Sequence, residues 1–407
     1  MRTPTLSTSI GVLFSSVKAE PVSLPITEVY VPLMLDGQTL NFYADSGSAR
    51  TFAIYGPMYE ERHGKGSCDE IPSKCYFCPT NVSCDDIFKR KRWEVSFADG
   101  EEVEYVQHNV TLSIGGKVLP EFELGLIAAF DNTDGIEMTP DGLLGLSGGR
   151  SSIPETFLEQ LKRRRVISDL VYSIHAEEQG PSITGNLILD DSSTTGDLAI
   201  PFSYHPTRSR SKIVVPLWSL RVFDSERNLL TRISWEVSQR TEHGPSPGYV
   251  DTGASSLLIS KNDFGTIVNA TRAAMQRYNK DTYQLVWQDP ETRFNMIRRE
   301  AIPYLPTLGY VIGEPPHDMD IRIEPKHYIH PCEGSTCFLA ITPDISEDLT
   351  LGQPLFRAYD VTINLPSRQV HFSPHRRDYK TVAKARLSHR LRSLVRRLLK
   401  KRGRRLL

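Results

Sequence analysis

Two short segments of the chain carry the residues best suited to chemistry. The triplet Asp45–Gly47 reads Asp-Ser-Gly, and the triplet Asp251–Gly253 reads Asp-Thr-Gly. Each triplet stands between two short apolar or aromatic runs, which predicts a strand, a tight turn and a second strand. Two carboxylates held about 3 Å apart repel by roughly 5–6 kcal/mol at an effective dielectric constant near 20, so the pair keeps one proton between its members. The ionised member can remove a proton from water while the protonated member donates to a carbonyl oxygen.

A second motif repeats in register with the first. Gly145 ends the run Asp-Gly-Leu-Leu-Gly 100 residues after Asp45, and Gly352 ends the run Asp-Leu-Thr-Leu-Gly 101 residues after Asp251. Two motifs that recur in the same order and at nearly the same distance indicate a chain built from two related halves.

The segments between these motifs predict a mostly β fold with few helices. Strands are expected at Trp93–Phe97, Val103–Ile114, Leu187–Leu189, Ile213–Val215, Val361–Leu365 and Val370–Phe372. One helix is expected over Pro154–Arg165, with Ser152 and Glu155 in capping-box spacing, and another over Lys261–Tyr278. The polar segment Asp190–Ser211 is the expected seam between the halves.

By these residues the chain resembles the pepsin-like (family A1) aspartic peptidases over about residues 26–374. The segment Asp141–Ser147, followed by a helix, resembles the family's first lobe, and Ile345–Phe372 resembles its final segment. The resemblance implies a mostly β, bilobal fold of two related β-barrel-like lobes with an active-site cleft between them. It also implies that Asp45 and Asp251 are the catalytic pair and that no metal or cofactor is required.

The resemblance further assigns supporting roles around the pair. The expected support residues are Ser46, Gly47, Ser48, Thr252 and Gly253. The two glycines let the backbone approach the carboxylates closely. The hydroxyls of Ser46 and Thr252 are expected to cross-link the two turns, and Ser48 to hydrogen-bond the outer oxygen of Asp45.

The match departs from the family at positions that bear on activity. Ala254 stands where many relatives have a hydroxyl that supports the second aspartate, and its loss should raise the apparent pKa values of the pair. The predicted pH optimum is therefore less acidic than that of stomach-type enzymes. The flap that covers substrate is expected at Phe97, Ala98, Asp99 and Gly100, with Phe97-Ala98 in place of the usual Tyr-Gly. Phe97 cannot donate a hydroxyl hydrogen bond.

These departures keep an alternative function open: a pepsin-fold binding protein that is catalytically weak or inactive. Both aspartates and both glycines are retained, which a binding module does not need. A glycosidase with two carboxylates is a much weaker alternative, because such enzymes have no reason to contain twin Asp-[Ser/Thr]-Gly turns. The resemblance therefore predicts an aspartic endopeptidase that favours hydrophobic residues around the scissile bond and is inhibited by pepstatin-like compounds.

Composition supports a soluble globular body with distinct ends. The 407 residues are 39% hydrophobic and 24% charged, as in ordinary folded proteins. The expected division is a signal peptide at 1–19, an N-terminal lobe at 20–198, a C-terminal lobe at 199–375 and a basic tail at 376–407. Strands are expected from about Ile26, which leaves no room for a propeptide of the family's usual length.

The net charge of −1 conceals a strong asymmetry. Residues 375–407 hold 14 of the 48 Lys and Arg residues and one of the 49 acids, so the body carries about −14. Leucines at helical spacing in this tail, from Leu387 to Leu398, suit a basic amphipathic helix. Contact with an anionic membrane, contact with the acidic body and a solvated tail all remain open. The body is not expected to bind nucleic acid, and a monomer is expected.

Six cysteines favour an oxidising compartment. Cys68, Cys75, Cys78 and Cys84 form one group, for which disulfides are favoured over a zinc knuckle, with all three pairings open. Cys332 and Cys337 are expected to pair with each other. Glycosylation triplets begin at Asn81, Asn109 and Asn269. Together these features predict a secreted protein, or one of an endolysosome-like or vacuole-like compartment.

Overall fold

The computed structural model describes residues 20–80, 82–97, 100–133, 139–149, 152–177, 182–191, 199–204, 212–234, 245–290, 292–344 and 349–375. The predicted signal peptide, the basic tail, Asn81, Ala98 and Asp99 lie outside these ranges. In the described part of the chain, no helix is both long enough and apolar enough to cross a membrane.

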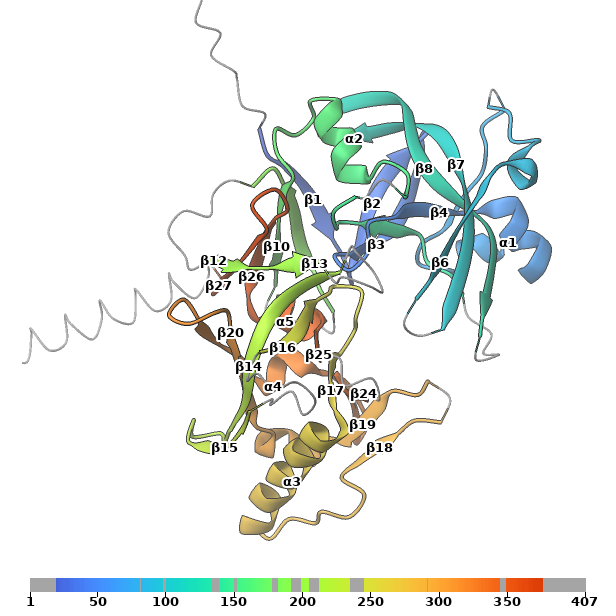
Figure 1. The fold of residues 1–407 in the computed structure, drawn as a ribbon. Helices are drawn as coiled ribbons and strands as arrows, with labels where there is room; N and C mark the ends of the chain where they lie inside the picture. Colours follow the sequence, from blue (N-terminus) through green and yellow to red (C-terminus); the bar gives the residue numbers. More distant parts are fainter. Residues whose placement is uncertain are drawn as a thin grey trace, which may run out of the picture.

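An eight-stranded sheet forms the body of the N-terminal half (blue to teal in Figure 1). Its strands, in spatial order, are β2 (Tyr30–Leu35), β3 (Gln38–Asp45), β9 (Leu143–Gly145), β4 (Thr51–Tyr55), β8 (Lys117–Asn132), β7 (Glu101–Ile114) and β6 (Arg92–Ser96), with β5 (Cys75–Tyr76) beside β4. An additional pairing between β2 and β7 folds the sheet back on itself.

A nine-stranded sheet forms the corresponding body of the C-terminal half. Its path runs through β21 (Met319–Ile323), β20 (Thr307–Ile312), β14 (Ile213–Phe223), β16 (Ser246–Val250), β25 (Leu349–Leu351), β17 (Leu257–Ser260) and β24 (Ile341–Asp344), while β13 (Ser203–Tyr204) and β15 (Leu229–Ser234) pair with β14. A separate four-stranded sheet contains β18 (Val286–Gln288), β19 (Asn295–Arg298), β23 (Thr336–Leu339) and β22 (Ile329–Glu333).

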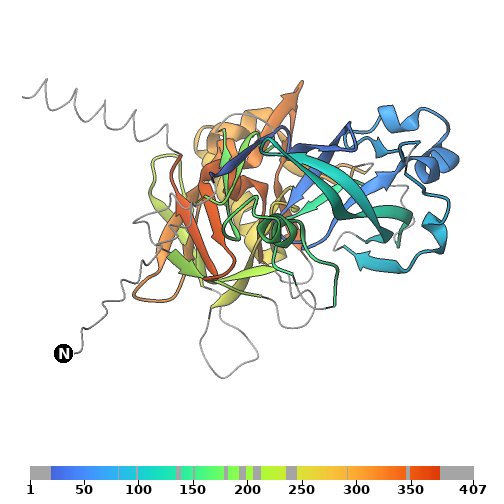
Figure 2. The same cartoon turned by 90° about the horizontal axis from the view of Figure 1, so that it is seen from above.

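A six-stranded sheet joins the two halves. It contains β1 (Val22–Ile26), β11 (Gly185–Leu189), β10 (Val171–Ala176), β26 (Asp360–Asn364), β27 (Gln369–Ser373) and β12 (Ala199–Pro201), in that order. Strand β10 of the first half pairs directly with β26 of the second, so the halves share a continuous hydrogen-bonded layer. Figure 2 shows this layer beside the two lobes. The division at residue 198 stays a prediction, because 192–198 lie outside the described residues.

Alternating side chains explain how these strands close a core. In β1 and β2, every second residue is buried, as expected for strands with one face on the interior. One large cluster of buried apolar residues contains members from Val22 to Phe372 and includes residues of both lobes and of the shared sheet. The predicted strands all lie within or across observed ones, because their β-branched and aromatic residues suit a half-buried pleated surface.

The described residues form five α-helices: α1 (Gly56–His63), α2 (Phe157–Arg163), α3 (Lys261–Arg277), α4 (Pro325–Tyr328) and α5 (Gln353–Ala358). The helix predicted at Lys261 is confirmed by α3. The other prediction placed its cap wrongly: α2 is capped by Thr156 and Glu159, the same box four residues later than the predicted Ser152 and Glu155. Thr156 directly precedes the buried Phe157-Leu158 run, which anchors the helix in the core, and Glu159 directly follows it.

Candidate active site

The two Asp-[Ser/Thr]-Gly turns occupy equivalent places in the two large sheets. Strand β3 ends at Asp45 and runs parallel to β9, with Asp45 opposite Gly145. Strand β16 ends at Val250, opposite Leu351 in the parallel strand β25, so Asp251 follows with Gly352 as its counterpart. The motifs that repeat in the same order and spacing along the chain therefore also pair in the same way within the two sheets.

The hydroxyls of Ser46 and Thr252 link the two turns reciprocally. Thr252 Oγ1 accepts a hydrogen bond from the backbone nitrogen of Ser46 at 2.9 Å and donates to the carbonyl oxygen of Ala44 at 2.7 Å. Ser46 Oγ accepts from the backbone nitrogen of Thr252 at 3.0 Å and donates to Val250 O at 3.2 Å. Both hydroxyls are fully buried, so these four bonds fix the turns against each other in a region without competing water.

The two carboxyl groups meet above this cross-link. Each accepts a hydrogen bond from the glycine two residues on: Gly47 N to Asp45 Oδ1 at 2.7 Å and Gly253 N to Asp251 Oδ1 at 2.8 Å. A methyl group on Gly47 would lie about 2.5 Å from the Asp251 carboxylate, and one on Gly253 would lie 2.8 Å from Asp45. Glycine is needed at both places because each turn touches the other's carboxylate.

Burial and mutual repulsion decide the protonation of this pair. Asp45 is only 6% exposed. Burial, followed by the charge of Asp251, raises the pKa of Asp45 well above its usual range, while the hydrogen bond from Gly47 N lowers it. The balance favours a pair that holds one proton, which is the state required to activate water with one member and to donate with the other.

Ser48 does not make the predicted contact. Among the described residues, its hydroxyl accepts a hydrogen bond from the backbone nitrogen of Arg50 at 3.2 Å and makes none with Asp45. The prediction is wrong because Ser48 begins the segment that enters β4, where a serine readily captures the N–H two residues further on.

The structure describes two of the four expected flap residues, Phe97 and Gly100. Strands β6 and β7 form an antiparallel hairpin, and Phe97 N donates to Glu101 O at 2.8 Å at its tip. Phe97 is half-buried and packs against an apolar cluster that includes Phe52, Tyr105 and Phe130. Gly100 N donates to Phe97 O at 3.3 Å, and Gly100 has a φ of 90°, which suits a turn. The role of this hairpin as a flap stays a prediction.

Two residues that sequence reasoning missed lie beside the second turn. Tyr43, two residues before Asp45, donates to Gly253 O, and Gln353, directly after Gly352, donates to the hydroxyl of Tyr43. The clue in the sequence was a polar side chain beside each motif: a tyrosine just before the first Asp turn and a glutamine just after the second Leu-Gly pair. A buried polar side chain is informative because it must find a partner.

The three disulfides resolve the cysteine alternatives. Cys68 pairs with Cys75, Cys78 with Cys84, and Cys332 with Cys337, the last as predicted. The first two bridges close neighbouring small loops of one surface insertion. Asn109 and Asn269 are both exposed, at the surface of β7 and α3, and their glycosylation stays a prediction.

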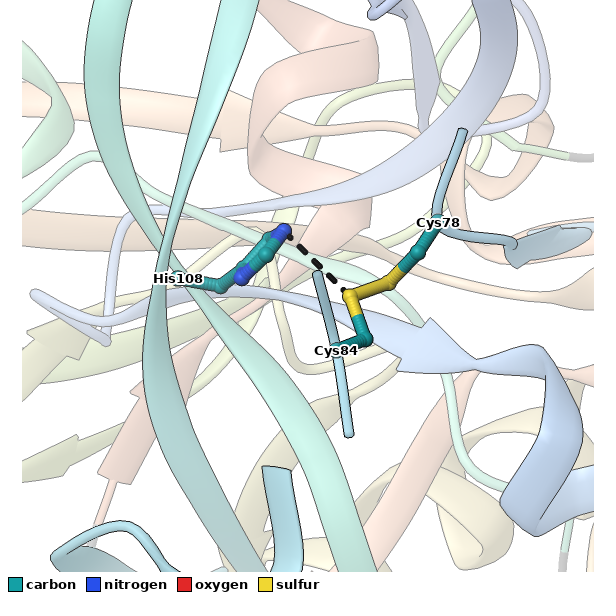
Figure 3. Close-up of side chains that lie close together, drawn as sticks. All are labelled: Cys78, Cys84 and His108. Carbon is teal, nitrogen blue, oxygen red and sulfur yellow. Dashed lines mark hydrogen bonds between the residues drawn. A yellow bond between two sulfur atoms is a disulfide. The ribbon is translucent and has the colours of Figure 1, made fainter. Parts of the chain in front are cut away.

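Within the described ranges, one group of side chains has the residue types and close spacing of a metal site. Cys78, Cys84 and His108 lie close together (Figure 3). The sulfurs are joined in the disulfide, so they are not the thiolates that zinc binds. A guanidinium group can only donate, so His108 Nδ1 must accept from Arg90 Nη1 at 2.9 Å, which leaves the hydrogen on Nε2, facing Cys84 Sγ at 3.8 Å. This arrangement satisfies the imidazole without a metal.

Comparison with known proteins agrees with this architecture. Gastricsin of Cavia porcellus is 24% identical over 274 residues, which are 65% of this chain and 61% of gastricsin, so the chain spans about three fifths of that relative's length. The crystal structure of an aspartic proteinase from Irpex lacteus has a TM-score of 0.61 at 16% identity and covers 88% of this chain and 98% of its own. The predicted fold class, mostly β with two pepsin-like lobes, is confirmed by this match.

The family follows from the extent of the sequence match. The model of eukaryotic aspartyl proteases matches residues 35–375, which include both Asp-[Ser/Thr]-Gly turns and both Leu-Gly partners. This range is most of the chain. The chain therefore belongs to the eukaryotic aspartyl protease family.

Proposed function

We propose that this chain is an aspartic endopeptidase that hydrolyses peptide bonds with a water molecule activated between Asp45 and Asp251. One observation carries the proposal: two turns matched in sequence, register and backbone bonding touch each other, so that the glycine of each turn lies against the carboxyl group of the other. A pair in this geometry cannot ionise fully without placing two charges in contact, so it supplies a base and an acid at once.

The mechanism follows from the shared proton. The ionised carboxylate removes a proton from the water, whose oxygen then attacks the scissile carbonyl carbon. The protonated carboxyl donates its proton to the carbonyl oxygen and stabilises the tetrahedral intermediate. Collapse of the intermediate breaks the C–N bond: the carboxyl that took the proton from water gives it to the leaving amine, and the other carboxylate takes a hydroxyl proton from the intermediate, so the pair again holds one proton in its starting arrangement. Ser46 and Thr252 hold the distance between the carboxyls, and Gly47 and Gly253 supply the hydrogen bonds that orient them.

The substrate class and the cellular setting are part of the same proposal. Extended peptides with hydrophobic side chains on both sides of the scissile bond are the expected substrates, and pepstatin-like compounds the expected inhibitors. Three disulfides and the membership of a family that includes gastricsin support a site of action along the secretory route, either outside the cell or in an endolysosome-like or vacuole-like compartment.

The decisive experiment measures cleavage of a denatured protein between about pH 3 and pH 7, by the wild-type chain and by Asp45→Asn and Asp251→Asn. Pepstatin-sensitive cleavage that each substitution abolishes is the expected result. Cleavage that survives either substitution contradicts the proposed pair.

A pepsin-fold binding protein remains the second candidate, favoured by the presence of Phe97 and Ala254. It becomes the better conclusion if the folded wild-type chain cleaves nothing across this pH range but still retains a peptide or a pepstatin-like compound on a column.

A further inference from the structure

Two residues outside the Asp251 turn, Tyr43 and Gln353, hold its backbone. Three successive carbonyl oxygens follow Asp251, and each accepts a hydrogen bond from Tyr43 or Gln353. Gln353 Nε2 donates to Thr252 O at 3.3 Å, Tyr43 OH donates to Gly253 O at 3.4 Å, and Gln353 N donates to Ala254 O at 2.8 Å. In the Asp45 turn, backbone nitrogens donate to two carbonyl oxygens: Leu146 N to Asp45 O and Ser147 N to Ser48 O.

Tyr43 and Gln353 belong to different lobes. Tyr43 lies on β3, two residues before Asp45, whereas Gln353 is the first residue of α5, directly after the glycine that pairs with the second turn. Gln353 Nε2 donates to Tyr43 OH at 2.7 Å, the shortest bond of the group. The bond thus connects β3, which carries Asp45, to α5, whose first residue donates to the backbone of the Asp251 turn.

The hydrogen atoms of this network have a single consistent arrangement. Ser182 Oγ donates to Gln353 Oε1 at 2.8 Å, Gln353 Nε2 donates to Tyr43 OH, and Tyr43 OH donates onward to Gly253 O. A flipped Gln353 amide would point its oxygen at Thr252 O, which can only accept, so the network allows one orientation. Gln353 is only 3% exposed, where an unpaired amide is costly.

Tyr43 remains a donor throughout the working pH range. Burial, followed by the charges of Asp141 and Asp45, raises the pKa of its hydroxyl above the ordinary value. Its ring is fixed as well, because it packs edge-on against Tyr30 with ring centroids 5.5 Å apart. A rigid ring with a permanent donor suits the task of fixing a neighbouring carbonyl, not that of exchanging protons.

We infer that Tyr43 is a positioning residue for the catalytic pair, and that with Gln353 it sets the place of the Asp251 turn relative to Asp45 across the lobe boundary. The four bonds of Ser46 and Thr252 fix the base of the two turns, whereas Tyr43 and Gln353 fix the part of the second turn beyond the carboxylate. The inference rests on the proposed function, since it concerns the same pair. Small displacements matter here, because misplacing a reacting group by about 1 Å can lower a rate about 100-fold.

The test compares Tyr43→Phe with the wild type. Loss of the hydroxyl alone is expected to lower kcat about 5- to 20-fold and to leave KM within about 2-fold, because the bond acts on the carboxylates and not on substrate affinity. The variants Gln353→Leu and Ser182→Ala should move kcat in the same direction, the latter least. Tyr43→Phe and Gln353→Leu combined should lower kcat no further than the larger single effect, since both remove one network.

Tyr30→Phe is the matched control. It deletes the hydroxyl of the ring packed against Tyr43, but that hydroxyl donates to Asp141 at 2.9 Å and does not contact the Asp251 turn. It should lower thermal stability while kcat stays within about 2-fold of the wild type.

A second measurement separates failure of this inference from failure of the proposed function. Carboxyl carbon NMR titration of Asp45 and Asp251 reports the coupling of the pair without any turnover. In Tyr43→Phe, the two apparent pKa values should lie closer together, because a less constrained turn lets the carboxyls separate. A Tyr43→Phe chain with unchanged titration and unchanged kcat overturns the inference, and so does one whose KM rises while kcat stays the same. If the titration is altered in Tyr43→Phe while the wild-type chain cleaves no peptide, the inference is supported and only the peptidase proposal fails.

Discussion

The carboxylate of Asp360 lies 3.0 Å from His175 Nδ1, across the junction of β26 and β10 where the two halves of the chain meet. Asp191 lies on the other side of the ring, with its Oδ2 3.3 Å from Nε2. Asp360 also faces His375, whose Nδ1 is 2.8 Å away and whose Nε2 is 2.8 Å from Arg357 O. Each imidazole thus has an acceptor at both nitrogens, an arrangement that only a doubly protonated ring satisfies.

The first prediction concerns how this cluster responds to pH. Hydrogen bonds to Asp191 and Asp360 raise the pKa of His175 to about 9, from 6.5. A group whose pKa rises on folding stabilises the folded state fully below its unfolded pKa, and that contribution disappears as the pH passes its folded pKa. His175 should therefore contribute at most about 3 kcal/mol below pH 6.5, and this contribution should vanish by about pH 9.

The contribution of Asp360 to stability changes with pH in the opposite direction from that of His175. Burial opposes ionisation of Asp360, but the hydrogen bonds from His175 and His375 outweigh it and lower the pKa of Asp360. The stabilisation from this carboxylate is present above its unfolded pKa and is lost as the pH falls through the folded pKa. Between these limits, in moderately acidic solution, the cluster stabilises the junction most.

Thermal melting from about pH 5.5 to about pH 9 tests the statement about His175, in an Asp45→Asn background that prevents self-cleavage. His175→Gln should lower Tm at about pH 5.5 and have little effect at about pH 9, so the difference between the two chains should shrink as the pH rises. His330→Gln is the control, because burial lowers the pKa of His330 to about 4 and the ring is neutral throughout. A His175→Gln effect that is equal at both pH values contradicts the prediction.

The second prediction concerns the hydroxyl that joins the turns. Thr252→Val keeps the shape but leaves Ser46 N–H and Ala44 O without partners in a buried site. Two such groups should cost about 2–4 kcal/mol of unfolding free energy and abolish most activity. Thr252→Ser keeps the hydroxyl and should retain activity. The control is Thr271→Val, where a buried threonine of α3 loses only a bond to Ile267 O within its own helix. Equal effects of Thr252→Val and Thr271→Val on urea unfolding would show that the cross-link contributes no more to the free energy of unfolding than one hydrogen bond within a helix.

The sequence predicted the parts of this site that depend on local pattern and repetition. The Asp-[Ser/Thr]-Gly turns and their Leu-Gly partners could be found because each constrains its own backbone, and their common spacing implied a common register. Tyr43, Gln353 and Ser182 could not be found in this way. Their bonds join residues that are 310 and 171 positions apart, and no local pattern records such a contact.

The same distinction explains the errors. The predicted bond of Ser48 to Asp45 was carried over from the family, whereas the observed bond to Arg50 N is a purely local turn preference. The cluster of His175, Asp191, Asp360 and His375 was likewise invisible, because it forms only when β10 and β26 pair. Its histidines show no spacing along the chain that would mark them.

The third prediction concerns the pH dependence of activity. Burial and the charge of Asp251 raise the pKa of Asp45, so the pair keeps its shared proton to higher pH. Activity should therefore extend to less acidic pH than in stomach-type enzymes, and a wild-type optimum near about pH 2–3 contradicts this expectation. Ala254→Ser offers a hydroxyl that can support the ionised Asp251, and it should move the optimum toward acid by less than about one pH unit. The measurement is kcat/KM across the pH range for both chains.

The fourth prediction concerns the hairpin of β6 and β7. If this hairpin closes over substrate, Phe97→Tyr adds a hydroxyl at its tip and should raise kcat/KM about 2- to 10-fold, the effect of one added hydrogen bond. The control is Phe294→Tyr, which adds a hydroxyl to a ring that is 48% exposed and packs at a tilt against Phe338 elsewhere in the C-terminal half. No gain for Phe97→Tyr, with a correctly folded chain, would place the hairpin away from the bound peptide.

The last prediction compares alanine substitutions at two glycines, Gly352 and Gly265, whose surroundings differ. A methyl group on Gly352 would overlap Ser256 O and Ala254 O, which are backbone atoms that cannot move aside without displacing the Asp251 turn. Ala254 O is also the acceptor of Gln353 N, so the displacement would reach the network of Tyr43. Gly352→Ala should therefore destabilise the chain by about 3 kcal/mol or more and lower kcat.

Gly265, inside α3, has open space where its methyl group would lie. Gly265→Ala should stabilise the chain by about 0.5–1 kcal/mol, because alanine loses less backbone entropy in a helix, and it should leave kcat unchanged. Urea unfolding and peptide cleavage of both variants check the pair of predictions. A Gly352→Ala chain that is as stable as the wild type would mean that the Leu-Gly partner of the second turn is looser than its contacts imply, and the matched register of the two halves would then have little part in holding the carboxylates.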